Sequence, residues 1–180
     1  MPNWTFYPVF IGTIISVIGL SRIALMESGN NAPNTLSELA AAEDALLGRF
    51  RNILIICGVL FAITLFGFIA PQVGHVAFVL FFGILMIGGE LLASVIPARG
   101  NTAGTHLFLS KIMAIGMLGL GILFSVSLPG VFLVLAVTLT IAMIAFGLLT
   151  LLDKKHYLVY ELAFIFASHF SVVVAALALK

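Results

Sequence analysis

The chain of 180 residues contains only eight basic and seven acidic side chains, whereas 62% of its residues are hydrophobic. Soluble domains carry roughly a quarter charged residues and somewhat under half apolar ones. Because so few charges cannot cover a water-exposed surface, the composition excludes a soluble enzyme, a nucleic-acid-binding domain and a disordered tail, and it indicates a chain embedded in a bilayer.

Six apolar segments follow one another along the chain, each close to the roughly 20 residues that cross a bilayer as a helix. We expect them near residues 4–26, 50–71, 74–96, 106–128, 130–152 and 157–179. Residues typical of turns separate them, and the runs are too long for the strands of a membrane barrel. The sequence therefore predicts an all-α, polytopic membrane protein, a bundle of six transmembrane helices forming one domain over residues 1–180.

The one long connection, residues 27–49, has two parts. Residues 27–34 have the composition of a loop, and Thr35-Leu36-Ser37-Glu38 then fits a capping box, in which a hydroxyl and a carboxylate bind the free N–H groups of a helix start. Apolar and acidic residues alternate at helical spacing after it. We predict an amphipathic helix extension over about 36–49 that continues into the second span as one long helix. The alternative is a lid or a partner-docking element.

The basic residues indicate an orientation. Six spans place both termini on one face, and seven of the eight basic residues lie at or near the other face: Arg22, Arg49, Arg51, Arg99, Lys111, Lys154 and Lys155. Lysine and arginine in short loops favour the cytoplasmic side. We therefore expect both termini on the non-cytoplasmic side and the amphipathic extension on the cytoplasmic side.

Three ionisable residues, Glu90, Lys111 and Glu161, fall inside predicted spans at similar depths in the cytoplasmic leaflet, by the 1.5 Å rise per helical residue. A charge near the bilayer centre costs at least ~2.5–3.5 kcal/mol, so each needs a partner or water. One interpretation is ion pairing of Glu90 with Lys111 and of Glu161 with Arg22. Another is that Lys111 and Arg22 extend to the interface. The functional interpretation is a polar ligand-binding site open to the cytoplasmic leaflet, formed by Glu90, His106, Ser110, Lys111, Glu161, Arg22 and Tyr157.

Small residues at four-residue spacing predict the faces on which helices pack closely. Gly58 and Ala62, and likewise Gly89 and Ala93, are such pairs. Two adjacent glycines also precede Glu90, which permits close approach of a neighbouring helix or of a ligand. We favour helix packing.

The histidines do not have the spacing of metal ligands, because no two lie four residues apart on one helix. His169 alone lies deep in a span, where we expect it to hydrogen-bond a neighbouring helix, with a proton relay as the alternative. The single cysteine, Cys57, cannot form an internal disulfide and is expected in the core. We predict no metal site and assign no catalytic residue, and the cofactor is unknown.

Three classes of function fit these features. We favour a non-catalytic membrane protein, either an accessory subunit of a membrane complex or a lipid- or amphiphile-binding protein. Its expected partners are the lipid bilayer and a second copy of the chain or a larger membrane complex, and not nucleic acid. The first alternative is a small transporter or channel subunit for a polar solute or ion. The second is an intramembrane enzyme using Glu90, Glu161 and His106, although no serine-site motif, aspartate pair or phosphate-binding loop is present.

Short motifs spread over most of the chain carry a family resemblance. They are Ile96-Pro97 followed by Thr105-His106, Phe50-Arg51-Asn52-Ile53-Leu54 with Gly58, and Tyr160-Glu161. In these the chain resembles a six-helix family of prokaryotic integral membrane proteins of unknown function. The resemblance implies a six-helix bundle in a prokaryotic inner (cytoplasmic) membrane, with a site at His106, and it implies no activity.

The orientation is tested by reporter fusions. A reporter that is active only in the cytoplasm is expected to be silent when fused after Lys180, because the basic loops hold the other face inside. The same reporter inserted between Lys154 and Lys155 is expected to be active. Activity of the C-terminal fusion would reverse the assignment.

Overall fold

A computed structural model describes residues 3–25 and 35–180, and these residues form helices and short connections without strands. The long helices are α1 (Pro8–Leu25), α3 (Asp44–Thr64), α4 (Val76–Val95), α5 (Ala103–Ser127), α6 (Gly130–Leu152) and α7 (Tyr157–Ala178). A short helix, α2 (Leu36–Ala42), precedes α3. Shorter helical segments are η1 (Asn3–Phe6), η2 (Leu65–Ile69), η3 (Gly100–Thr102) and η4 (Lys154–His156). The predicted loop over residues 27–34 lies outside the described residues.

Six helical segments are long and apolar enough to cross a membrane, which confirms the predicted helical class and is consistent with a membrane protein. They are Trp4–Leu25, Asp44–Ile69, Val76–Val95, Gly100–Ser127, Gly130–Leu152 and Lys154–Ala178. The second and fourth begin at Asp44 and Gly100 rather than near residues 50 and 106. The predicted starts mark where the apolar residues begin, whereas the helices begin earlier, in the polar turns that precede the apolar residues.

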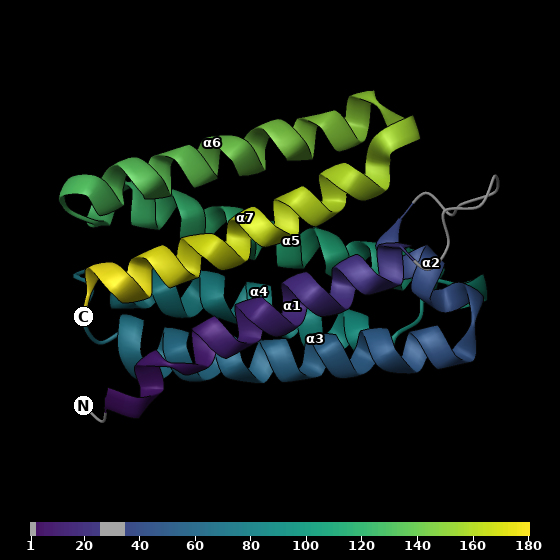
Figure 1. Cartoon of the computed structure of the whole chain (residues 1–180), viewed down its shortest axis with the longest axis horizontal. Coiled ribbons are helices and arrows are strands. Elements are labelled where there is room, and N and C mark those ends of the chain that lie inside the picture. Colours follow the sequence, from purple (N-terminus) through teal and green to yellow (C-terminus); the bar gives the residue numbers. More distant parts are fainter. Residues whose placement is uncertain (1–2, 26–34) are drawn as a thin grey trace.

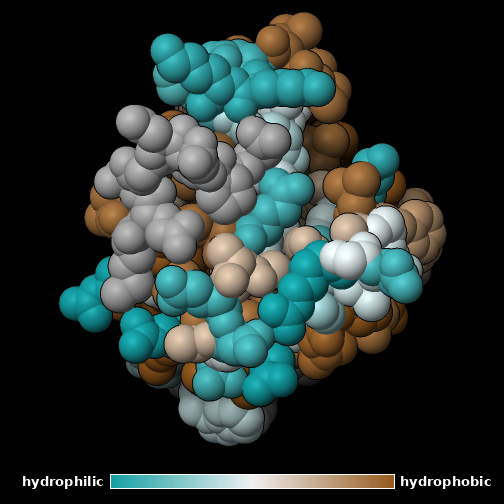
Figure 2. Space-filling view, turned by 90° about the vertical axis from the view of Figure 1, so that its right-hand side faces the viewer, coloured by the Kyte–Doolittle hydropathy of each residue, from teal (hydrophilic) through white to brown (hydrophobic). Residues whose placement is uncertain are grey.

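The long helices run side by side, with the chain ends at one end of the bundle and α2 at the other (Figure 1). α3 packs on α1 and α4, α5 packs on α4 and α6, and α7 joins α6 to α1. We call the end with α2, the α4–α5 connection and η4 the basic end. Hydrophilic side chains gather on this end, whereas hydrophobic side chains lie around its margins (Figure 2).

The amphipathic extension is not one continuous helix, so that part of the prediction was wrong. The break falls at Glu43, whose extended backbone (φ −128°, ψ 136°) ends α2 and starts α3. Gly48, a weaker helix former than its neighbours, nevertheless lies inside α3. Four of the seven side chains of α2 are buried, and its Leu36 and Leu39 join a core cluster with residues of α1, α3 and α7. A straight helix would leave this apolar face uncovered.

The hydroxyl half of the predicted capping box is confirmed. The backbone N–H of Glu38 donates a hydrogen bond to the Thr35 side-chain oxygen at 3.0 Å. Thr35 has the extended backbone typical of the residue before a helix (φ −130°, ψ 156°). This capping starts α2 at the predicted residue.

The second span ends in a turn of π-helix that the sequence did not indicate. Its wider ring is closed by a bond from the N–H of Ala70 to the carbonyl of Leu65 at 2.8 Å. The hydroxyl of Thr5 donates to the carbonyl of Gly67 within this turn at 3.4 Å. Such turns insert one extra residue into a helix, so the side chains beyond it change direction.

α4 and α5 approach each other at backbone contact. A Cβ atom added to Gly116 would lie 2.3 Å from the backbone nitrogen of Met86, and one added to Gly89 would lie 2.7 Å from that of Met113. Only hydrogen fits in these positions. The predicted packing role of Gly89 is therefore confirmed, and the approach sets the rotation of α4 about its own axis.

Replacing Gly89 with alanine is expected to destabilise the bundle by about 1–3 kcal/mol, the usual cost of overpacking, because backbone atoms of α5 must move. The neighbouring Gly88→Ala is the matched control, since nothing lies within 4 Å of its added Cβ. It is expected to be neutral or stabilising by about 0.5–1 kcal/mol, because alanine favours a helix over glycine. Unfolding in mixed micelles measures both. Equal effects of the two substitutions would contradict the close contact.

Candidate functional site

A groove of about 670 Å³ lies between α1 and α3 at the basic end. Its polar lining comes from Arg22 in the last turn of α1 and from Arg49 and Asn52 in the first half of α3. Its apolar lining consists of Gly19, Ile23, Leu25 and Ile53. The groove therefore combines two positive charges with apolar walls.

The backbone of α1 lets Ile53 form the floor of this groove. A Cβ on Gly19 would lie 2.6 Å from the Cδ1 atom of Ile53, so a larger residue would push this side chain away. Arg22 and Arg49 are exposed, and among residues 3–25 and 35–180 neither forms an ion pair. By contrast, Arg99 pairs with Asp44 at 3.0 Å. The guanidinium groups at the groove are thus available to an anion.

The expected ion pair between Glu90 and Lys111 is absent. Gly89 faces Met113 of α5, which confirms that Glu90 and Lys111 lie at similar heights. However, consecutive helical residues point about 100° apart, so Glu90 turns away from α5 and lies 1% exposed against α3. Lys111 is exposed. The sequence predicted the similar height of the two residues along the bundle, but it did not predict the direction of the Glu90 side chain.

The expected ion pair between Glu161 and Arg22 is also absent. The carboxylate of Glu161 accepts a hydrogen bond from the backbone N–H of Leu36, the first residue of α2, at 2.7 Å. A carboxylate at a helix start binds a free N–H group and the positive end of the helix dipole. Glu161 thus holds α2 against the bundle, whereas Arg22 lines the groove.

The other predicted site residues lie in separate surroundings. His106 donates from Nδ1 to the carbonyl of Ile96 at 2.6 Å, which ties the start of α5 to the end of α4. Ser110 and Tyr157 are half-buried. Of the seven predicted residues, only Arg22 lines the α1–α3 groove. The structure does not bring Glu90, Lys111 and Glu161 into one cluster, and ligand binding by each stays a prediction.

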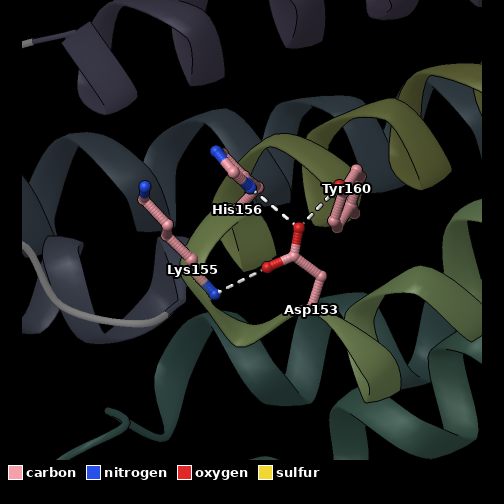
Figure 3. A network of polar contacts seen from close by, with 4 residues as sticks. All are labelled: Asp153, Lys155, His156 and Tyr160. Atoms are coloured by element: carbon pink, nitrogen blue, oxygen red, sulfur yellow. Dashed lines mark hydrogen bonds and ion pairs between the residues drawn. The ribbon is translucent and has the colours of Figure 1, made fainter.

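A polar network closes the turn between α6 and α7 (Figure 3). One oxygen of Asp153 accepts hydrogen bonds from His156 Nδ1 at 2.8 Å and from the Tyr160 hydroxyl at 3.0 Å. The other accepts from the backbone N–H of Lys155 at 3.1 Å. The bond from His156 is the main cause that lowers the pKa of Asp153 below its usual value. This network stabilises the turn that the sequence predicted at these residues.

The deep histidine does not hydrogen-bond a neighbouring helix, so that expectation was wrong. Both ring nitrogens of His169 are buried without a hydrogen-bond partner among the described residues. Its ring instead packs on Phe61 of α3, with centroids 4.4 Å apart. No group of three or more histidine, cysteine or acidic residues in the described part of the chain is arranged to hold a metal ion.

Arg49 and Asn52 line the groove but were not predicted as site residues. Arg49 is the last residue of the predicted extension, and Asn52 lies near the start of the second predicted span. The sequence shows Arg22 and Arg49 as basic residues of the same predicted face. It does not show that they come together at one groove, because this depends on the antiparallel pairing of α1 with α3.

Searches against protein-family models, curated proteins and solved structures find no match for this chain. The site is therefore interpreted from its own geometry.

The Asp153 network predicts a loss of stability in acid. Because folding lowers the pKa of Asp153, its contribution is present above the ordinary carboxyl pKa of about 4 and is lost as the pH falls through the lower folded value. Asp153→Asn is expected to lower the melting temperature at neutral pH and to reduce its acid dependence. Lys155→Ala, which retains the backbone donor, is the control. An identical acid profile in D153N would contradict this role.

Proposed function

We propose that the protein is a non-catalytic membrane protein that binds an anionic phospholipid at the cytoplasmic leaflet, with its headgroup in the α1–α3 groove. The observation that carries this proposal is the combination of two guanidinium groups, which form no ion pair with a described residue, and an amide with apolar walls in one groove. Arg22, Arg49 and Asn52 bind the phosphate. Ile23, Leu25 and Ile53 contact the upper part of an acyl chain.

The chemistry of the groove supports a phosphate-bearing ligand. Guanidinium groups bind phosphate oxygens through two parallel hydrogen bonds, and they lose less hydration energy than an ammonium group does. The groove is open at the surface of the helices and lies at the end where basic residues gather. With that end facing the cytoplasm, the groove meets the leaflet that holds anionic lipids, which attract each nearby basic residue by about 1 kcal/mol.

The same geometry supports binding rather than catalysis. Among residues 3–25 and 35–180, the lining offers no nucleophile and no carboxylate or histidine to act as an acid or base. Arginine stays protonated at physiological pH, so it orients and neutralises an anion without exchanging protons.

The proposal is tested by native mass spectrometry of the detergent-solubilised protein with added phosphatidylglycerol or phosphatidylcholine. The double variant R22Q/R49Q is expected to bind phosphatidylglycerol about tenfold more weakly. This loss is somewhat smaller than the one expected if each arginine contributed the full value of about 1 kcal/mol to the binding free energy. Binding of phosphatidylcholine should change little, because its headgroup has no net charge and is not attracted by the two guanidinium groups that the variant removes.

Arg51→Gln is the matched control, because Arg51 is exposed on α3 but does not line the groove. It removes one positive charge of the same end but no groove donor, so it is expected to weaken binding clearly less than R22Q or R49Q does, because an exposed charge outside the groove is screened by salt. Equal losses in R51Q and in R22Q or R49Q would indicate general charge attraction and contradict a built site.

A further inference from the structure

Glu90 occupies an unusual position for an acid in an apolar helix. Its side chain is 1% exposed, and its Oε2 atom is buried without a hydrogen-bond partner. The carboxyl group lies beside Gly58 of α3, since a Cβ added there would be 3.8 Å from Oε2, an ordinary van der Waals contact. Glu161 of α7 differs because its carboxylate accepts a hydrogen bond from the Leu36 N–H group.

The surroundings of Glu90 offer no fixed counter-charge. From α3, the nearest titratable group is the thiol of Cys57, which donates to the carbonyl of Gly12 at 3.3 Å. From α5, the Met113 backbone packs on Gly89, and Lys111 is exposed rather than turned towards the carboxyl. From η2, Leu65 and Phe66 pack near Gly83, farther along α4. No described lysine, arginine or histidine pairs with Glu90.

An ionised carboxylate without a counter-ion is far too costly in an apolar interior, so such a group takes up a proton or binds a cation. A single monovalent cation bound to the carboxyl removes this cost, whereas a divalent ion would leave a net charge and needs six or more oxygen ligands. Buried oxygen atoms without partners lie on α1 as well, at Thr13 and Ser16. Ser16 is one helical turn from Gly12, whose carbonyl is bound by Cys57 next to Glu90.

We propose that Glu90 is a binding site, inside the helix bundle, for one exchangeable monovalent cation, a proton or a sodium ion. The site lies on the α3–α4 contact and is separate from the basic groove between α1 and α3. The carboxyl group faces Gly58 of α3, and the contact of Gly89 with Met113 holds it in that direction.

The experiment uses dicyclohexylcarbodiimide, an apolar reagent that enters micelles and bilayers and reacts with protonated carboxyl groups. The carboxyl proton moves to a carbodiimide nitrogen, and the carboxyl oxygen bonds to the central carbon. An acyl shift from oxygen to nitrogen then gives a stable adduct that retains all atoms of the reagent. Peptide mass spectrometry locates the adduct in the full-length protein.

In sodium-free buffer we expect an adduct on Glu90 that decreases at least about threefold between pH 6 and about pH 9, as the exchangeable proton is lost. E90Q removes the adduct, whereas E161Q, the matched control, retains it. Protection by sodium but not by choline at constant pH identifies sodium as a second occupant, and the lack of protection identifies the proton alone.

Two results would overturn the site. One is the absence of an adduct on Glu90 in sodium-free buffer at every pH, while the unfolded protein reacts. The other is an adduct whose yield does not change with pH or sodium. Both measurements are made on the wild-type chain, so they stand even where E90Q fails to fold, and neither depends on lipid binding in the groove.

Discussion

The backbone contact between α4 and α5 determines how the polar interior is arranged. Gly89 and Gly116 bring the two helices so close that an added Cβ would meet backbone atoms. With this face of α4 committed to α5, the next residue, Glu90, turns to α3. A looser contact would let α4 rotate, and the carboxyl group could then reach the interface or Lys111. The glycines of the α4–α5 contact thereby place the carboxyl group of Glu90 where no described basic residue forms an ion pair with it.

Much of the fold follows from the sequence because apolar length and turn residues are local signals. The six helices, the capping of α2 by Thr35 and the turn at Asp153 were predicted in this way. Depth within a helix is also local, since it depends only on the rise per residue. The direction of a side chain is not local, because it depends on which neighbour each face meets. Both predicted ion pairs failed for this reason.

The break between α2 and α3 at the basic end could not be predicted from the sequence, because it depends on tertiary contacts. Nothing in Glu43 itself ends a helix, and Gly48, the weaker helix former, remains helical. The chain turns at Glu43 because Leu36 and Leu39 gain burial, and because Glu161 on α7 binds the first N–H of α2. Glu161, which was predicted to be part of a binding site, thus has a structural role in holding α2. The groove between α1 and α3 lies beside α2.

The two proposed sites are linked through α3. Asn52 and Ile53 line the groove, and Gly58 lies under the carboxyl of Glu90, about 7.5 Å farther along the same helix at 1.5 Å per residue. A helix packed on both sides moves as a unit, so a change in its contact with α4 also changes its contact with α1. Gly19 and Ile53 have little freedom to absorb such a shift, because their contact is already tight. Loss of the cation from Glu90 would introduce a buried charge on the α3–α4 contact, and the most direct relief is separation of these helices. The groove proposed to bind lipid lies on the contact of α3 with α1, so the two proposed sites share one helix.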